Sequence, residues 1–332
     1  MTAGPAAPAA ARLSAARDQL QVLEAAMRAA YIGQDDVLRG VLIALLAGGN
    51  ILLEGAPGLG KTALVKILSE ATHMRFSRIQ FTPDLMPADI TGGPTLLRGP
   101  SGEPELHFRP GPIFANIVLA DEINRGTPKT QAALLEAMQE RSVTIAGVRH
   151  SLEAPFLVIA TQNPIEMEGT YPLPEAQLDR FLFKLDVPFP SLAVLTRIGM
   201  ETTGAHTQAV PRVLDVPTML GMQALVREIT VSDSLGESAA RLVMATHPTA
   251  PDAPALIKKV VRYGAGPRAL QALLLAGRAH ALLEGRAHVQ SSDIAAVARP
   301  VLRHRVFLRF EASLDGTSGD DVVDAVLAAR RP

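Results

Sequence analysis

Cysteine is absent from the 332-residue chain. This absence excludes disulfide bonds, thiolate metal sites and cysteine nucleophiles together. The chain also lacks a charge excess of either sign, since 32 basic and 33 acidic residues leave a net charge of −1. The overall charge therefore gives no reason to expect nucleic acid or an acidic membrane surface as a partner. The histidines show no metal-ligand spacing, so no zinc site is predicted from them.

Long hydrophobic runs are missing as well. The longest, residues 41–53, is interrupted by Gly48, Gly49 and Asn50 and is too short to span a bilayer. The first twenty residues lack the continuous apolar stretch of a secretory signal. We therefore expect a cytoplasmic protein without membrane insertion. Hydrophobic residues make up 48% of the chain, which is enough for a globular protein of about two domains with a sizeable core.

The clearest motif that is present lies in NILLEGAPGLGKTALVKIL, residues 50–68. Gly55, Gly60, Lys61 and Thr62 fit the phosphate-binding pattern G-x-x-x-x-G-K-[ST], between a short apolar strand and a helix. Backbone N–H groups of such a loop and the dipole of the helix face the phosphates. Lys61 would neutralise the β- and γ-phosphates, and the Thr62 hydroxyl would bind Mg²⁺. We interpret this segment as a nucleotide-binding loop.

The order of the predicted elements indicates two domains. Residues 1–11, rich in Ala and Pro, predict a disordered tail. Strands alternate with helical segments over residues 12–190, which favours an α/β domain with a parallel sheet and helices on both faces. We expect a linker at 191–217, irregular from residue 200, and an all-helical domain at 218–332.

Periodicity and turn residues place the individual elements. Thr127 is the expected N-cap of a helix that begins at Pro128. Two hairpins are expected, one that pairs 94–97 with 105–108 and one over 143–154 that turns at Gly147. Strands are expected at 51–53, 75–81, 116–120, 156–161 and 181–187, and further helices at 12–30, 35–47, 63–69, 219–229, 235–246, 267–283 and 291–301.

Polar residues at the ends of two later strands complete a hydrolytic site. In IVLADEIN, Asp121 follows a buried strand and would hold Mg²⁺, and Glu122 would polarise the attacking water. Two solvated acids after a strand are the alternative. In FLVIATQNP, Asn163 would hydrogen-bond the γ-phosphate or the water, because ligands bind at the carboxyl ends of parallel strands. Asn before Pro is also a common turn former.

Two arginines are candidates for contacts with the γ-phosphate. Arg180 lies in LPEAQLDRF and Arg268 in GAGPRAL, and the planar guanidinium of each could bridge phosphate oxygens. The alternative is that either one pairs with a carboxylate such as Asp179 or Glu175. Spacing alone does not separate these two interpretations.

The motifs GAPGLGKT, IVLADEIN, ATQNP, LPEAQLDRF and GAGPRAL, in this order, resemble those of AAA+ ATPases. The words DEINRGTPKTQAALLEAMQER and ATQNPIEMEGTYPLPEAQLDRF resemble the MoxR family in particular, and the resemblance runs from about Tyr31 to Leu302. It implies an αβα domain with a five-stranded parallel sheet, an all-helical lid and assembly into a ring, usually of six subunits. The two predicted hairpins match the inserts of that clade.

The resemblance also implies roles for individual residues. Arg180 matches the arginine finger that reaches a neighbour's ATP, and Arg268 matches the sensor-2 arginine of the lid. Gly266 stands where this motif commonly has Ser, which puts only a cap hydrogen bond in doubt. Asn163 matches sensor 1. Contacts with ATP and Mg²⁺ are implied for Gly33, Gln34, Gly55, Ala56, Pro57, Gly58, Leu59, Gly60, Lys61, Thr62, Ala63 and Asp121, of which Thr62 and Asp121 would hold the metal.

Three functions are weighed against these motifs. Members of the family are similar to chaperones that mature or activate protein complexes, often with a partner that carries a von Willebrand factor A (VWA) domain. A nucleic-acid motor is the alternative, because the insert that the hairpin at 143–154 matches also occurs in replicative helicases. Residues 251–310 also hold ten Lys and Arg against three Asp and Glu, and a basic stretch can track phosphates, although a solvated helix face or a subunit contact is the favoured interpretation. A nucleotide-gated ring that hydrolyses little is disfavoured by Glu122 and Asn163. We favour the ATP-driven remodelling of proteins.

Overall fold

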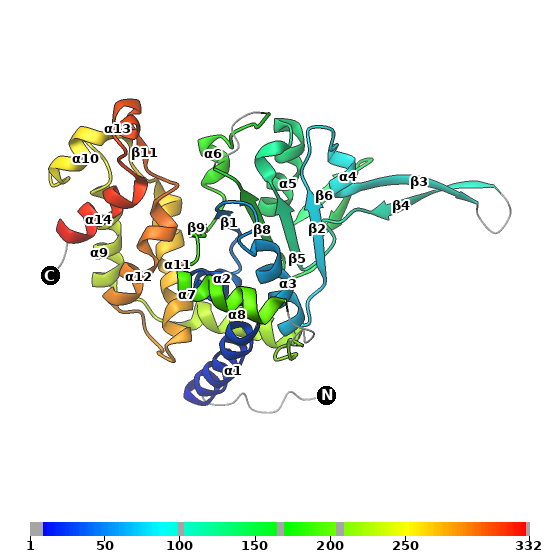
Figure 1. Cartoon of the computed structure of the whole chain (residues 1–332), viewed down its shortest axis with the longest axis horizontal. Helices are drawn as coiled ribbons and strands as arrows, with labels where there is room; N and C mark the ends of the chain where they lie inside the picture. Colours follow the sequence, from blue (N-terminus) through cyan, green and yellow to red (C-terminus); the bar gives the residue numbers. More distant parts are fainter. Residues whose placement is uncertain (1–8, 99–102, 165–168, 204–208, 330–332) are drawn as a thin grey trace.

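The computed structural model describes residues 9–98, 103–164, 169–203 and 209–329 (Figure 1). Helix α1 (Ala9–Ala30) begins within the predicted tail, of which residues 1–8 lie outside the described ranges. None of the helices in these ranges is long and apolar enough to cross a membrane.

A five-stranded sheet forms the centre of the first domain. Its order is β2-β5-β8-β1-β9, and every neighbouring pair is parallel. Because all strands run the same way, their carboxyl ends meet at one edge of the sheet, where the motifs for nucleotide binding end. The predicted strands are confirmed, with bounds β1 (Ile51–Glu54), β2 (Phe76–Gln80), β5 (Ile117–Asp121), β8 (Leu157–Gln162) and β9 (Phe183–Asp186).

Alternating side chains of the sheet divide between two hydrophobic cores. Ile51 and Leu53 of β1 belong to one core, whereas Leu52 points into the other. The period of two along a strand produces this division, and each face is then covered by helices. Helices α1, α2 (Asp35–Ala47) and α3 (Lys61–Ala71) contribute to the first core, and α4 (Pro87–Thr91) and α5 (Pro128–Glu140) to the second. The domain is therefore an αβα sandwich.

Local signals begin and end these elements as predicted. The Thr127 hydroxyl accepts a hydrogen bond from the backbone N–H of Thr130 at 3.4 Å, and Pro128 opens α5. Gly48 ends α2 in the left-handed conformation at φ 66°. Both cap positions follow from short stretches of sequence, because they depend on a few neighbouring residues.

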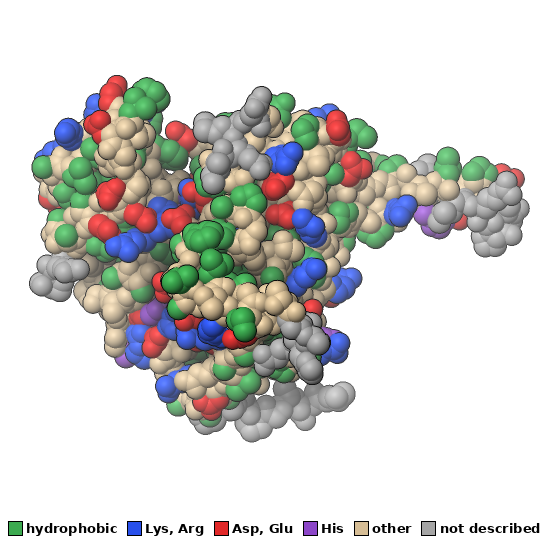
Figure 2. Space-filling view, viewed as in Figure 1, with side chains coloured by type: hydrophobic (Ala, Val, Ile, Leu, Met, Phe, Trp, Pro, Cys, Tyr) green, Lys and Arg blue, Asp and Glu red, His purple; other side chains and the backbone are tan. Residues whose placement is uncertain are grey.

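Two hairpins interrupt the α/β pattern. Strands β3 (Gly92–Arg98) and β4 (Pro104–Pro110) pair 94–97 with 105–108, as predicted, and the hairpin projects from the body of the molecule (Figures 1 and 2). Strands β6 (Ser142–Ile145) and β7 (Val148–Ser151) form the second hairpin, also predicted. Its two central residues, Ala146 and Gly147, have positive φ values of 50° and 80°, as the tight right-twisted turn requires.

A short helix α6 (Glu175–Leu178) precedes β9. Within the predicted linker at 191–217 the structure forms helix α7 (Leu192–Thr202), which was not predicted. Ser191 caps α7 by accepting a hydrogen bond from Val194 N–H. The helix is hidden in the sequence because it lies on the surface, with Leu192 83% and Met200 77% exposed, and so lacks a buried stripe (Figure 2).

The second domain is a helical lid beside the β9 edge of the sheet (Figure 1). Helices expected at 219–229, 235–246, 267–283 and 291–301 are confirmed. A two-stranded antiparallel pair of β10 (Val261–Tyr263) and β11 (Phe307–Leu308) is added, because residues distant in the chain meet there. The helices are α8 (Val216–Glu228), α9 (Asp233–Met244), α10 (Ala255–Val260), α11 (Pro267–Leu283), α12 (Ser291–Leu302), α13 (Phe310–Leu314) and α14 (Gly319–Ala329).

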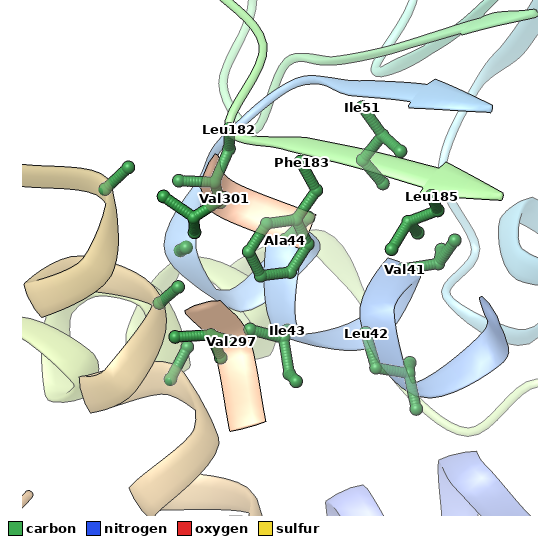
Figure 3. Packing of buried hydrophobic residues seen from close by; sticks show 14 of the residues in the cluster. Val41, Leu42, Ile43, Ala44, Ile51, Leu182, Phe183, Leu185, Val297 and Val301 are labelled. Carbon is green, nitrogen blue, oxygen red and sulfur yellow. The ribbon is translucent and has the colours of Figure 1, made fainter. Parts of the chain in front are cut away.

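The lid shares its hydrophobic core with one face of the α/β domain. Val297 and Val301 of α12 lie beside Phe183 of β9 and Ile43 of α2 in one cluster (Figure 3). Apolar area removed from water stabilises contact at roughly 25 cal/mol per Å², so a shared core joins two domains firmly. The lid is therefore docked on the sheet edge rather than tethered by the linker alone.

Candidate nucleotide-binding site

The predicted phosphate loop connects the carboxyl end of β1 to the first turn of α3. Gly58 and Gly60 have φ values of 80° and 77°, a region that side chains with a Cβ rarely adopt. A Cβ at Gly55 would lie 2.8 Å from the carbonyl oxygen of Val187. These glycines let the backbone curl at the start of α3, where the helix N-terminus attracts anions.

Lys61 lies within the concavity of this loop. In the structure its Nζ donates hydrogen bonds to the carbonyl oxygens of Gly55 and Ala56, the latter at 3.2 Å. Burial lowers the pKa of Lys61, while the charges of Asp121, Glu122 and Glu54 oppose that shift. Asp121 ends β5 and Glu122 follows it, and the loop with Lys61 follows the carboxyl end of β1 in the same parallel sheet. The structure thus brings together the residues expected from 55–62 and 121–122.

Asp121 ends β5 as a buried carboxylate. Its burial argues against the alternative that both acids after this strand are merely solvated. Its Oδ1 accepts a hydrogen bond from the Thr161 hydroxyl at 2.6 Å. Its Oδ2 accepts from the Arg78 guanidinium at 2.7 and 3.0 Å. A hydroxyl oxygen at Thr62 and a carboxylate at Asp121 are hard oxygen donors, the type that Mg²⁺ prefers. Their chemistry therefore fits the implied metal.

Glu122 stands directly after β5 with φ 56°, a left-handed conformation. Its backbone N–H donates to the Thr161 hydroxyl at 2.8 Å, so Thr161 bonds both consecutive acids. The Glu122 carboxylate accepts hydrogen bonds from Gln80 at 2.9 Å and Arg125 at 3.2 Å. Asn163, one residue beyond β8 and only 5% exposed, lies at the same edge of the sheet.

Gln34 lines a cavity that neighbours the phosphate loop, and Gly33 precedes Gln34 in the left-handed conformation at φ 78°. The Tyr31 hydroxyl donates to Gln34 Oε1 at 2.7 Å and lies 3.5 Å from the carbonyl oxygen of Leu59. Gln34 Nε2 donates to the carbonyl oxygen of Pro188 at 3.0 Å. Both Gln34 and Pro188 line a cavity of about 400 Å³ between α2, β9 and α12. A nucleobase is of the size that this space could accept beside the phosphate loop.

The structure does not bring Arg180 and Arg268 to the phosphate loop of their own chain. Both line a cavity of about 310 Å³ together with Gly48, Gly49 and Asn50, which precede β1. The phosphate loop follows β1, and five residue steps of about 3.3 Å separate the two ends by roughly 16 Å. Arg268 instead pairs with Asp179 at 3.4 Å, which was the alternative for this residue.

Arg180 is also engaged within its own subunit. Its Nη1 donates to the carbonyl oxygen of Leu135 at 2.8 Å, while its buried Nε has no partner among the described residues. The two arginines thus lie together at the amino edge of the sheet. Neither motif alone predicts that they are close to each other. The predicted contact of Arg268 with the γ-phosphate is not formed within its own subunit, because the lid docks beside β9.

Three residues of the site were missed in the sequence: Arg78, Gln80 and Thr161. Arg78 and Gln80 alternate along β2 and therefore share a face, and Gln80 pairs with Asp121 across the parallel ladder. Their two-residue spacing was visible, but its meaning depends on β2 lying beside β5. Thr161 was hidden because it lies inside an apolar strand.

Fold and site together define a nucleotide-binding protein with a phosphate loop, a parallel sheet and a helical lid. Residues 50–183 match the model of the ATPase family associated with various cellular activities (AAA), and residues 254–326 match the AAA lid domain. The chain belongs to the MoxR family of AAA ATPases.

Similar proteins come from several bacteria. Chaperone MoxR1 of Mycobacterium tuberculosis is 42% identical, over 89% of this chain and 78% of its own length. The uncharacterised protein YeaC of Bacillus subtilis is 42% identical over 90% of each chain. Protein MoxR of Paracoccus denitrificans is 33% identical over 86% of this chain and 87% of its own. A crystal structure of a candidate ATPase from Cytophaga hutchinsonii superposes with a TM-score of 0.89 at 36% identity, covering 96% of both chains.

Proposed function

We propose that this protein hydrolyses ATP at sites shared between the subunits of a ring and so remodels or activates protein complexes. The observation that carries the proposal is that the phosphate loop with Lys61 and the consecutive acids Asp121 and Glu122 follow strands that end at the same edge of one parallel sheet. Membership of an ATPase family supports nucleotide binding with a metal ion, and a relative named as a chaperone supports protein clients.

In this proposal each residue at the carboxyl edge has one task. The loop N–H groups and Lys61 bind the phosphates, and Thr62 and Asp121 hold Mg²⁺. Bound Mg²⁺ supplies positive charge that offsets the phosphate oxygens. Glu122 orients a water and accepts its proton as the oxygen attacks the γ-phosphorus and the bond to the bridging oxygen of ADP breaks. Asn163 is a second hydrogen-bond donor toward the γ-phosphate or the water.

The positions of Arg180 and Arg268 support a site completed by a neighbour. They line a cavity with Gly48, Gly49 and Asn50, which precede β1, and so lie at the opposite edge of the sheet from the phosphate loop of their own chain. A head-to-tail ring would place this edge of one subunit against the carboxyl edge of the next. Both arginines, including the sensor-2 candidate, would then act on the neighbour's γ-phosphate. Six subunits are the number that the family resemblance suggests.

Protein clients are favoured over nucleic acid by the pairing of the basic stretch. Within 251–310, five of the ten basic residues bond to carboxylates, namely Arg268, Arg286, Arg299, Arg303 and Arg305. Guanidinium groups that are neutralised within the fold attract phosphate backbones weakly. A VWA-domain protein is the partner that we propose from the family resemblance.

Mixing two inactive variants tests the shared site. Arg180→Ala and Glu122→Gln damage opposite sides of one interface, so a mixed ring contains some interfaces with both residues intact. Each variant alone should bind ATP but lose most turnover, because an arginine finger contributes about 10³ or more. ATPase activity of the mixture should exceed the sum of the two parts.

Two measurements accompany the mixing. Calorimetric titration shows whether each variant keeps ATP affinity, and size-exclusion chromatography with light scattering gives the assembly state. A monomer that hydrolyses ATP at a rate independent of protein concentration, with Arg180→Ala fully active, would exclude the shared site.

A further inference from the structure

Three consecutive lid residues at the end of α12 bond to the segment that carries Arg180. Arg303 pairs with Asp186 at the end of β9. His304 Nε2 donates to the carbonyl oxygen of Phe181 at 3.1 Å. Arg305 Nε donates to the Asp179 carboxylate at 2.9 Å. We call Arg303, His304 and Arg305 the lid clasp.

Arg305 makes the most extensive contacts of the three. Its guanidinium also donates to the carbonyl oxygens of Phe181 at 2.6 Å and Leu182 at 3.1 Å, the two residues that follow Arg180 in the chain. The side chain is only 4% exposed. A buried guanidinium is costly unless its donors are satisfied, so this fork holds residues 179–182 in one conformation.

Asp179 connects the lid clasp to the second arginine. One carboxylate oxygen accepts from Arg305 and the other lies 3.4 Å from Arg268 Nη1. His304, the residue between Arg303 and Arg305 in the chain, is a neutral donor. Its burial, and after that the charge of Arg305, lower its pKa well below 6.5. The clasp therefore contacts the backbone beside Arg180 directly and the side chain of Arg268 through Asp179.

We propose that the lid clasp positions Arg180 and Arg268 for the active site of the neighbouring subunit, so that the lid of one subunit controls hydrolysis in the next. This inference rests on the shared site proposed above. His304 and Arg305 lie against residues 179–182 at the amino edge of the sheet, whereas Arg303 also lines the cavity of about 400 Å³. They are positioning residues, and displacement of an arginine by about 1 Å can cost on the order of a hundredfold in rate.

Directional mixing separates this role from simple stabilisation of the fold. Arg305→Lys keeps a positive charge beside Asp179 but loses the fork that donates to two carbonyl oxygens. It should keep ATP affinity within about twofold and lose on the order of tenfold to a hundredfold in turnover. Mixed with Glu122→Gln it should recover activity, because the Glu122→Gln subunit supplies well-placed arginines. Mixed with Arg180→Ala it should not, because both variants are damaged on the same side.

Three further variants control for charge and for folding. Arg241→Lys makes the same change on lid helix α9, at an exposed pair with Glu237 that does not contact residues 179–186, and should keep full activity. His304→Leu removes a neutral donor without changing charge and should lower turnover in the same direction. His304→Gln should restore the donor and the activity. Thermal melts in each case report whether the variant is folded.

The outcomes are distinct. If Arg180→Ala and Glu122→Gln do not complement each other, the shared site is wrong and the role of the clasp falls with it. If they do complement but Arg305→Lys and His304→Leu keep wild-type turnover, or if Arg305→Lys is rescued equally by both partners, only the clasp is refuted. Rescue by Glu122→Gln alone supports it.

Discussion

At the scale of single residues, Glu122 is held in place by Gln80 and Arg125, and its backbone by Thr161. Glu122→Gln keeps the size and most hydrogen bonds but cannot accept a proton. We expect ATP affinity near wild type and turnover at least about a hundredfold slower. Steady-state ATPase assays beside calorimetry measure both. Glu70→Gln, an exposed acid on α3, is the control, and wild-type turnover in Glu122→Gln would assign the water-activating role elsewhere.

Lys61 differs from the other lysine of α3 in its surroundings. It is partly buried in the phosphate loop, whereas Lys66 is exposed one turn later. Lys61→Ala should weaken ATP binding by at least about tenfold, because a charged hydrogen bond to phosphate contributes roughly 1.5–3 kcal/mol. Lys66→Ala should leave the dissociation constant unchanged in the same titration. Equal affinities for both variants would contradict the assignment of the phosphate loop.

At the scale of elements, Asp293 joins α11 to α12. It is fully buried and accepts hydrogen bonds from Arg286, from His280 at 2.6 Å and from the backbone of Gln290 at 2.7 Å. Asp293→Asn should lower the free energy of unfolding by about 3 kcal/mol, since it leaves the partly buried guanidinium of Arg286 without its partner. Urea denaturation measures the change. Asp324→Asn, at the exposed pair with Arg299, should cost no more than about 1 kcal/mol.

The same carboxylate predicts a pH dependence. Burial alone would raise the pKa of Asp293, but the hydrogen bonds from Arg286, Gln290 and His280 outweigh it and hold the pKa below 3.8. A depressed carboxyl pKa stabilises the fold above the ordinary value, and this contribution is lost as pH falls through the folded value. The stability difference between wild type and Asp293→Asn should therefore shrink in strong acid. A difference that stays constant down to pH 2 would contradict this coupling.

At the scale of the whole molecule, half of the basic residues of 251–310 form ion pairs within the fold. Arg303 bonds Asp320 at 2.7 Å and Arg305 bonds Asp179, so part of the local charge excess is neutralised. We expect neither single-stranded nor duplex DNA to stimulate ATP hydrolysis. Any DNA binding should be weak and collapse between low and physiological salt. Several-fold stimulation at physiological salt would instead favour a nucleic-acid motor.

Local features of this protein were accessible from sequence. The phosphate loop, the cap at Thr127 and the tight turn at Gly147 each depend on a few neighbouring residues, so a short window contains the physical cause. The strands were accessible because an apolar run between turn residues indicates a buried strand. Asp121 and Glu122 were accessible because the carboxyl ends of parallel strands meet at one edge.

Features that depend on long-range packing required the fold. Helix α7 carries no buried stripe, so its sequence lacks the periodic signal, and β10 pairs with β11 only because the lid brings them together. The roles of Arg78 and Gln80 depend on β2 lying beside β5 in one register. Arg268 illustrates the same limit. Its motif predicted a phosphate contact. Where Arg268 lies relative to the phosphate loop depends on how the lid docks on the α/β domain. That docking is made by an apolar core whose residues are far apart in the chain, so a short stretch of sequence does not reveal it.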